Sequence, residues 1–427
     1  MDDLKLVADD TGIKQNTRQY DALSDDVFFS QVLGKSYTVD PYPVLKKLQF
    51  SQPVYQSSMG PWVIFSYEEA RALLKDPRLV GDPKGTRLYK NYVAMGQQEF
   101  SSHALTHMQF TDGAEHSRVR GNFATYISNS AFKEQLREWA QEIVDTLINE
   151  ISQQKSEIEL VSQFAGRLPA RLFCRILDVP ETDDLLLSSY ANDLVAADDP
   201  DFLLTEQRYK ITVAASQKLS RYLGEKLIRK KHQPSNDLLS YLLSSLDIQR
   251  FQNLQELIVN LIFFIVAGIK TTSDFISNTI MAFYQFPQQK TLFIENTDNM
   301  DNMLTECFRY DSPIQQTPRF TTEVVEVKGI EIPAGEHVMI MISSANRDPQ
   351  IFDQAHELNL LRVNAKSHIG FGGGAHFCLG SMFARMEAEV ALPAFLSCFP
   401  NYQISDESQR GVGFTLRGFE RLIMQQG

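Results

Sequence analysis

Cysteine is scarce in this sequence, and the few cysteines present are widely separated. The 427 residues contain four cysteines, and no Cys-x-x-Cys pair occurs among them. This spacing excludes the common zinc motifs and a disulfide framework. Cys174 and Cys307 stand among apolar residues at helical spacing, where a cysteine is usually a small buried hydrophobic residue, and we expect the same of Cys398.

An excess of positive charge, flexible linkers and a leader sequence are also missing. The formal net charge of -12 argues against general nucleic-acid binding. No Pro/Gly/Ser-rich linker or repeat divides the chain, so we expect one large domain over residues 1–427. The N-terminal MDDLKLVADD lacks the basic and apolar regions of a secretory signal, and no apolar run approaches the roughly 18 residues of a membrane span. The sequence therefore predicts a cytoplasmic protein without a membrane partner.

Helical periodicity dominates the rest of the chain. The longest predicted helix runs from about Asn253 to Phe286, before Pro287, and would measure on the order of 50 Å. Its middle is apolar on nearly every side, which is typical of a helix buried in a large core. Residues 62–76 (WVIFSYEEARALLKD) predict a strand followed by a helix, and residues 323–342 predict a small sheet. The predicted fold class is mainly α with small β-sheets.

Cys378 differs from the other cysteines because it stands in FGGGAHFCLG, residues 371–380. Glycines allow the backbone to approach a flat, bulky ligand closely. The residues after Cys378 have helical periodicity, which places the sulfur at or just before a helix N-terminus. Backbone N–H groups and the helix dipole lower the pKa of a thiol there, which favours an anionic metal ligand. A glycine-rich turn without any chemistry is the alternative.

Polar residues interrupt the predicted central helix at AGIKTTSD, residues 267–274. Polar groups in a core helix need a reason. One reason is purely structural, because threonine and serine hydroxyl groups can donate to carbonyl groups one turn earlier in the helix.

Together these motifs, in this order, resemble the cytochrome P450 family of the soluble bacterial type, and the resemblance covers most of the chain. FGGGAHFCLG is similar to the haem-ligand signature of that family at every fixed position. The resemblance implies the P450 fold and a haem b with Cys378 as its axial thiolate. It also implies that Phe371, Gly372 and Gly380 contact the haem.

Further residues match family positions that surround the haem. The two haem carboxylates need cations, because a buried unpaired charge costs several kcal/mol. The residues that match these cations are His116, Arg120, Arg319 and His368.

An ion network is implied on the same grounds. Glu306 and Arg309 match the Glu-x-x-Arg pair of the family, one helical turn apart, where a bidentate ion pair can close. Arg362 matches the arginine that completes this network, although Leu358 and Asn359 stand where Phe and Asp are usual.

The resemblance also gives the interrupted helix a function and exposes one departure from the family. Ala267, Gly268 and Thr271 match the oxygen-binding groove, where the helix widens beside the iron. Lys270 stands where the family usually has an acid that feeds a proton relay. Lysine could deliver a proton only if burial lowered its pKa. It could also pair with Asp274 one turn on, bind an acidic substrate or carrier-bound group, or mark an enzyme without the usual O₂ activation.

The function implied by the resemblance is that of a haem-thiolate monooxygenase. It would insert one oxygen atom from O₂ into a mid-sized organic substrate, free or carrier-bound, in a tailoring step of secondary metabolism. Electrons would come from an external ferredoxin or flavodoxin and its reductase, because the chain has no flavin or iron–sulfur domain. One alternative, motivated by Lys270, is a reductase-independent peroxygenase or a non-oxygenating catalyst of rearrangement or ring formation. Another is a haem sensor or scaffold without catalysis.

The resemblance also indicates which regions surround the substrate. We expect it to lie against Phe264 and Ala267, the loop near Tyr92 to Met108, the segment after Pro313 and the turn around Phe414. The mixed apolar and amide character of these regions favours a mid-sized organic molecule.

Overall fold

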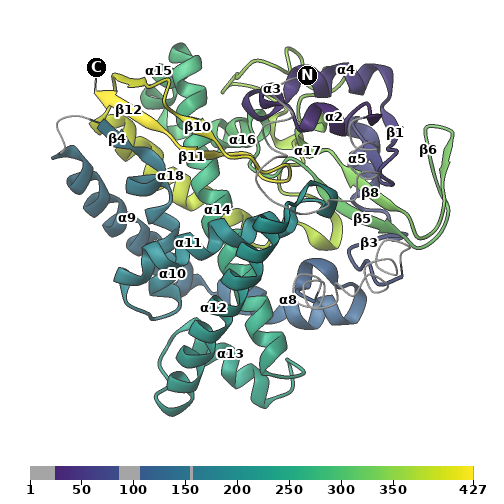
Figure 1. Ribbon diagram of the computed structural model, residues 1–427. Helices are drawn as coiled ribbons and strands as arrows, with labels where there is room; N and C mark the ends of the chain where they lie inside the picture. Colours follow the sequence, from purple (N-terminus) through teal and green to yellow (C-terminus); the bar gives the residue numbers. More distant parts are fainter. Residues whose placement is uncertain (1–24, 86–105, 154–156, 427) are drawn as a thin grey trace.

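Helices make up most of the molecule (Figure 1). The computed structural model describes residues 25–85, 106–153 and 157–426. The α-helices are α2 (Phe29–Val32), α3 (Lys35–Val39), α4 (Tyr42–Ser51), α5 (Tyr67–Leu73), α8 (Gly113–Ile127), α9 (Ser130–Ser152), α10 (Arg167–Ile176), α11 (Asp184–Leu194), α12 (Glu206–His232), α13 (Leu238–Asp247), α14 (Leu254–Gln285), α15 (Pro287–Glu295), α16 (Met300–Tyr310), α17 (Ile342–Ala345) and α18 (Ser381–Cys398). Short helical turns include η1 (Met108–Phe110), η4 (Val195–Asp198) and η8 (Gly374–His376).

The strands are short and form small sheets at the periphery of the helices. The largest sheet has the order β1-β2-β8-β5-β3, in which only β2 and β8 are parallel. The others are β4-β12-β9, β6-β7 and β10-β11, and all of their pairs are antiparallel. The strands are β1 (Val54–Gln56), β2 (Trp62–Ile64), β3 (Leu79–Val80), β4 (Glu157–Glu159), β5 (Thr317–Thr321), β6 (Val325–Val327), β7 (Ile330–Ile332), β8 (His337–Ile340), β9 (Tyr402–Ile404), β10 (Gln409–Arg410), β11 (Phe419–Arg421) and β12 (Ile423–Gln426).

The central helix α14 organises the core. Asn253 caps its N-terminus by accepting a hydrogen bond from the backbone N–H of Glu256, and Pro287 follows its last turn. Most of its side chains are buried in the largest hydrophobic cluster, together with residues of α9, α10, α16 and α18. The predicted helix from Asn253 to Phe286 is therefore confirmed to within one residue at each end.

Helix α14 also corrects an expectation about apolar runs. Among the described residues it is long and apolar enough, by length and composition, to cross a membrane, which the sequence had not led us to expect. Its burial in the core accounts for that composition, since a helix surrounded by protein is apolar on most sides.

The two predicted β-regions differ in outcome. Residues 62–76 form β2 followed by α5, as expected. Residues 323–342 form strands, but they are divided between two sheets. β6 and β7 pair across a tight turn at Lys328 and Gly329, both with positive φ, whereas β8 pairs with β2 and β5. The predicted single small sheet is thus a hairpin plus one strand of the main sheet.

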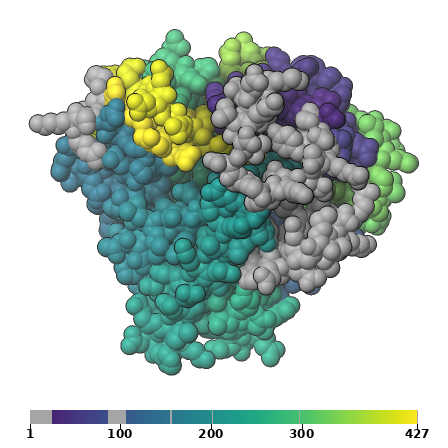
Figure 2. Space-filling model, in the orientation of Figure 1, coloured from purple at the N-terminus to yellow at the C-terminus, as the bar shows by residue number. Residues whose placement is uncertain are grey.

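The C-terminal residues return to the helical body. β12 pairs with β4, which follows α9 in the chain, and with β9, which follows α18. In Figure 2 this C-terminal segment, in yellow, lies directly against the blue helices that surround α9. Residues more than 260 positions apart, such as Leu422 and Glu159, are joined by a hydrogen bond from the Leu422 N–H to the Glu159 carboxylate (2.8 Å).

Candidate active site

The loop that carries Cys378 is fixed by its own backbone. The Cys378 N–H donates to the Phe371 carbonyl group (2.9 Å), which closes the loop. Gly372 and Gly374 have φ values of +71° and +65°, a region that residues with a Cβ rarely adopt. A Cβ on Gly374 would also lie 2.5 Å from the carbonyl oxygen of Leu74. These glycines are therefore required by the turn and by its contact with Leu74, in addition to any approach of a flat ligand.

The Cys378 thiol lies just before a helix, as expected, but its burial matters more than the helix. α18 begins at Ser381, with Gly380 as its N-cap. Burial raises the pKa of Cys378, and hydrogen bonds from the Gly380 and Ser381 N–H groups only partly oppose this, together with the charge of Arg120. The prediction that the helix N-terminus would itself favour a thiolate is incomplete. A bound cation is needed to stabilise the anion.

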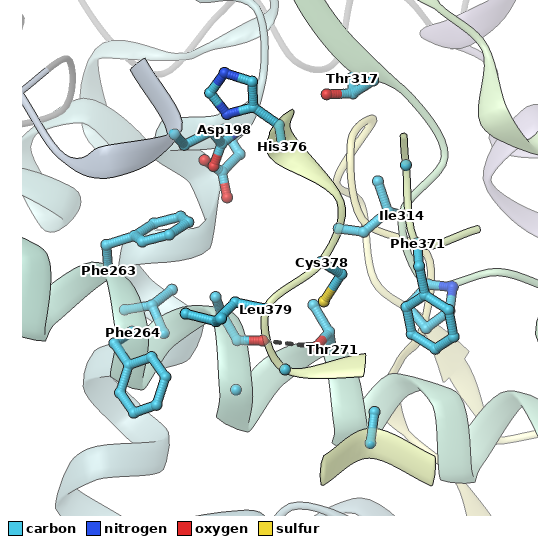
Figure 3. A pocket seen from close by; sticks show the side chains of 18 of the residues that line it. Asp198, Phe263, Phe264, Thr271, Ile314, Thr317, Phe371, His376, Cys378 and Leu379 are labelled. Atoms are coloured by element: carbon cyan, nitrogen blue, oxygen red, sulfur yellow. Dashed lines mark hydrogen bonds between the residues drawn. The ribbon is translucent and has the colours of Figure 1, made fainter. Parts of the chain in front are cut away.

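One cavity brings most of the predicted site residues together. Figure 3 shows the Cys378 sulfur pointing toward the part of α14 that carries Thr271. The cavity-lining residues that the sequence had singled out are Cys378, Phe371, Gly372, Gly380, His116, Arg120, Arg319, Phe264, Ala267, Gly268 and Thr271. They come from α8, α14, β5 and the cysteine loop, so tertiary folding assembles a site that is scattered over more than 260 positions of the sequence.

Two guanidinium groups of this cavity, that of Arg319 buried and that of Arg120 half-buried, have no acid partner among the described residues. Within the described residues, Arg120 donates only to the Phe377 carbonyl group (2.6 Å), and Arg319 donates to the Thr317 hydroxyl and the Pro318 carbonyl (3.2 and 2.7 Å). Burial lowers the pKa of both, that of Arg319 to about 10. Unpaired buried cations are costly unless an anion joins them. A haem, with two carboxylates and an iron for Cys378, fits this set of donors.

Two histidines line the same side of the cavity. His116 on α8 and His376 on η8 have ring centroids 4.3 Å apart. His376 Nε2 lies 3.0 Å from Asp112 Oδ1. Burial, followed by the charges of His376 and Arg120, lowers the pKa of His116 to about 4. His116 is therefore neutral at pH 7 unless an anion is bound beside it.

The position of His368 corrects the prediction that it contacts the haem carboxylates. His368 is not among the residues that line the cavity. Its ring packs near Phe308 and Phe371, its Nδ1 accepts a hydrogen bond from the Gly370 N–H (3.1 Å), and burial lowers its pKa to about 3. It is a neutral packing residue behind the cysteine loop. His376, which stands within the quoted motif itself, occupies the place expected of His368.

The stretch of α14 beside the sulfur is an unbroken α-helix. The Thr271 hydroxyl donates to the Ala267 carbonyl group (2.6 Å), the bond drawn in Figure 3, and the helix continues without interruption from Leu254 to Gln285. This hydrogen bond is the structural role that a threonine hydroxyl can have inside a helix, and the predicted widening of the helix beside the iron stays a prediction. Gly268 has a packing reason as well, since a Cβ there would lie 2.3 Å from the ring of Phe173 on α10.

Lys270 and Asp274 do not belong to the cavity, which corrects their predicted catalytic roles. The Lys270 ammonium group pairs with the Asp274 carboxylate one turn on, and neither residue lines the cavity. The Asp274 side chain is 1% exposed and packs against Gly418, where a Cβ would overlap the carboxyl group. Burial raises the pKa of Asp274, and the charges of Lys270 and Arg410 oppose this. Of the four alternatives for Lys270, the structure shows the ion pair.

The ion network predicted on α16 is present. Arg309 Nε and Nη2 lie 2.7 and 2.8 Å from the two carboxylate oxygens of Glu306, and Arg362 Nε lies 3.0 Å from Glu306 Oε1. The remaining donors of Arg309 reach the carbonyl groups of Asn346, Ala355 and Glu357. All three charged side chains are buried, and each charge is paired and hydrogen-bonded.

The expected substrate-contact regions are partly found. Phe264, Ala267 and the segment after Pro313 line the cavity, and Met108 does so at the end of the predicted loop. Residues 92–105 of that loop lie outside the described residues. In the turn around Phe414, Thr415 and Leu416 line the cavity, whereas the Phe414 ring packs 5.9 Å from Phe28 in a separate cluster.

The sequence analysis did not name several polar residues of the cavity, among them Asp198, Gln316 and Glu387, although Gln316 lies in the expected segment after Pro313. Glu387 on α18 is 3% exposed, and burial raises its pKa to about 8. A signal for it existed, because Glu387 stands at helical spacing from Phe383 and Val390 on the buried face of α18. Asp198 and Gln316 lie in irregular segments, where periodicity gives no such signal.

Comparison with known proteins agrees with this geometry. The chain is 29% identical to the biotin biosynthesis cytochrome P450 of Bacillus subtilis, over 88% of this chain and 93% of that protein. It is 30% identical to the cytochrome P450 monooxygenase PikC of Streptomyces venezuelae, over 91% of this chain and 90% of that one. The crystal structure of P450BioI in complex with an acyl carrier protein ligated to hexadec-9Z-enoic acid superimposes with a TM-score of 0.83, at 29% identity, over 92% of this chain and 100% of that chain.

A family model extends the agreement beyond individual relatives. The model described as Cytochrome P450 matches residues 86–410, which include the cysteine loop, the central helix and the Glu306 network. With this match over most of the chain, a relative at 30% identity and the shared fold, the chain belongs to the cytochrome P450 family.

Proposed function

We propose that this protein is a haem-thiolate monooxygenase that inserts one atom of O₂ into a mid-sized organic substrate. The observation that carries the proposal is that the Cys378 sulfur and the Thr271 hydroxyl face one cavity, bordered by cations that lack acid partners. When bound, the haem supplies the oxygen activation, in which a thiolate ligand favours cleavage of the O–O bond.

The residues of the chain would hold the haem, orient the Thr271 hydroxyl and exclude water from the cavity. Cys378 would hold the iron, and the side chains that would hold the haem carboxylates are His116, Arg120, Arg319 and His376. The Thr271 hydroxyl is kept in one orientation by the Ala267 carbonyl. Apolar side chains such as Phe263, Phe264 and Leu416 exclude water from the space above the sulfur. Glu387 in the cavity wall is buried, which raises its pKa to about 8, so it holds its proton at neutral pH.

The substrate and its delivery are proposals of the same kind. A mid-sized substrate fits the largely apolar cavity with few polar groups. A tailoring step of secondary metabolism is supported by a relative of Bacillus subtilis that is named for polyketide biosynthesis. A carrier-bound substrate has a precedent in the P450BioI complex. Electrons would be supplied by an external ferredoxin or flavodoxin and its reductase, in the cytoplasm.

The reductase-independent alternative was motivated by Lys270 standing where the family usually has an acid. The Lys270 side chain pairs with Asp274 outside the cavity, so position 270 supplies no acid to the oxygen-binding site, and the turnover measurement below decides between the two functions. The non-catalytic sensor gains no support, because the cavity contains a threonine and a proton-carrying carboxyl group in addition to a ligand for iron.

Two measurements test the proposal. The reduced protein with carbon monoxide should show the strongly red-shifted Soret band of thiolate ligation. With surrogate redox partners, a compound that displaces the distal water should stimulate NAD(P)H and O₂ consumption and yield an oxygenated product. Turnover that requires peroxide and proceeds without a reductase would favour the first alternative. Tight ligand binding without any product would favour the sensor.

A further inference from the structure

Asp198 carries a carboxyl group in the cavity wall that has no partner among the described residues. It ends the short turn η4 (Val195–Asp198), directly after α11, and it lines the same cavity as Cys378. Figure 3 shows its side chain directed into that space, above Phe263. Among the described residues its carboxyl group makes no hydrogen bond or ion pair, and the one charged group that acts on it is the like-charged Asp199.

The fold holds Asp198 in place without using its carboxyl group. The Thr415 hydroxyl donates to the Asp198 backbone carbonyl (2.7 Å). The neighbouring Asp199 carboxylate accepts hydrogen bonds from the Phe414 and Thr415 N–H groups (3.0 and 2.7 Å). Asp199 therefore joins η4 to the C-terminal segment, whereas the Asp198 carboxyl group serves no structural purpose that the described residues show.

A second unpaired acceptor belongs to the same group of residues. Gln316 is 2% exposed, and its Nε2 donates to the Thr415 hydroxyl (2.8 Å). Because the Thr415 hydrogen is given to Asp198, the Thr415 oxygen must accept from the Gln316 amide nitrogen, which fixes the orientation of the amide. The other amide atom, Oε1, is left buried with no partner. Gln316 also lines the cavity.

The surroundings favour a ligand with hydrogen-bond donors and a positive charge. The other nearby walls are apolar, with Val195, Phe263 and Leu416 among them. Burial, followed by the charge of Asp199, raises the pKa of Asp198 to about 7. A cation that reached this carboxyl group would stabilise its ionised form, and a carboxylate in an apolar site binds an ammonium group strongly. When Asp198 is ionised, its carboxylate and Gln316 Oε1 are two acceptors that cannot satisfy each other without a donor.

We propose that Asp198, with Gln316, binds a protonated amine of the substrate and so selects for basic substrates and against free carboxylic acids. The inference rests on the proposed function, because it places the amine at the end of a molecule whose other end lies over the haem. It gives the substrate a chemical class: an apolar body with a basic nitrogen away from the oxidised carbon.

Binding of three matched probes tests this assignment. N,N-dimethyldodecylamine, dodecanol and dodecanoate share one chain and differ only in the head group. Titrations of the holoprotein, followed by calorimetry and by the haem spectrum, should give affinity in the order amine, alcohol, carboxylate. We expect the amine to bind roughly 10- to 100-fold more tightly than the alcohol, as for a charge-assisted hydrogen bond in an apolar site.

Two variants separate the role of Asp198 from general effects. Asp198→Asn should abolish the preference for the amine and leave the affinity for dodecanol within about twofold. Asp193→Asn, on α11 and outside the cavity, is the matched control and should keep the preference.

In the wild type, amine affinity should rise between about pH 6 and pH 8 as Asp198 ionises, and this rise should be missing in Asp198→Asn. The other titratable groups of the cavity, which both proteins share, are His116, Arg120, Arg319, His376, Cys378 and Glu387.

The outcomes distinguish this inference from the proposed function. Amine binding that is no tighter than alcohol binding, including no binding at all, would overturn the assignment, as would a preference that persists in Asp198→Asn. The carbon monoxide spectrum recorded on the same samples reports the thiolate site independently. A normal spectrum with no amine preference refutes only the inference, whereas a missing thiolate band refutes the proposed function.

Discussion

Two groups of buried charges in this molecule differ in one respect: whether every charge has a partner. In the Glu306 network both arginines bind the same carboxylate, and their remaining donors reach backbone carbonyl groups. In the cavity Arg319 is also buried and Arg120 is half-buried, yet the described residues offer them no carboxylate. Since folding cannot leave a buried charge unpaired cheaply, the first group is complete without a ligand and the second group needs one. The distinction separates structural from ligand-binding residues of the same chemical type.

The largest expected effect comes from removing the ligand of the iron. Cys378→Ala should lose the red-shifted carbon monoxide band and all monooxygenase activity, because no other described cysteine lines the cavity. Cys398→Ala is the control, because Cys398 is the last residue of α18, and this variant should keep the carbon monoxide band and the activity. A thiolate band that survives in Cys378→Ala would show that the iron is held elsewhere.

Breaking the complete network should cost the fold itself. Glu306→Gln removes the shared carboxylate and leaves two buried arginines unpaired, which should destabilise the protein by about 3–5 kcal/mol. Urea unfolding and the yield of folded protein measure this. Glu389→Gln, which breaks the exposed pair with Arg137, should change stability by less than about 1 kcal/mol. A stable Glu306→Gln protein with an altered substrate range would contradict the structural role.

Two arginines on α8 allow the comparison to be made within a single helix. Arg118 is paired with Glu256 (2.6 Å), whereas Arg120, two residues on, lines the cavity without an acid partner. Arg120→Met should weaken haem binding by roughly 10- to 100-fold, as expected for the loss of a charge-assisted contact. Arg118→Met should lower unfolding stability by about 1 kcal/mol and leave haem binding unchanged. Haem binding is measured by haem transfer to an acceptor globin, and stability is measured by urea unfolding. If Arg118→Met and Arg120→Met weakened haem binding equally, the distinction between a structural and a haem-binding arginine would be refuted.

The smallest effect is expected at Lys270, where the structure replaced a catalytic role by an ion pair. Lys270→Met leaves the Asp274 carboxyl group buried without its partner, which should lower stability by about 1–3 kcal/mol. Ligand affinity and the coupling of electrons to product should not change, because neither residue lines the cavity. The double variant with Asp274→Asn should recover part of the loss.

A matched pair on the surface serves as the control for Lys270. Lys210 and Glu206 on α12 are also one turn apart, but they are exposed, so Lys210→Met should cost less than about 0.5 kcal/mol. Uncoupled turnover in Lys270→Met, with peroxide released instead of product, would restore a catalytic role for the lysine.

Local sequence determined the parts of this protein that depend on short-range physics. The periodicity of residues 253–286 and the proline that follows them predicted α14. The spacing of Glu306 and Arg309 places both side chains on one face of a helix, whatever surrounds it. The motif around Cys378 predicted the loop and the helix after it, because glycine conformation and helix geometry act within ten residues.

Tertiary structure alone decided where side chains of similar chemistry point. His368 and His376 stand eight positions apart in one loop, yet one packs behind it and the other lines the cavity. Lys270 lies next to Thr271, and the helix directs the lysine to Asp274 and the threonine to the cavity. Asp198 could be recognised as a site residue only from the structure, because the segment after α11, the segment after Pro313 and the C-terminal turn meet around it. Burial and pairing depend on neighbours distant in sequence, and these decide whether a charge is structural or available to a ligand.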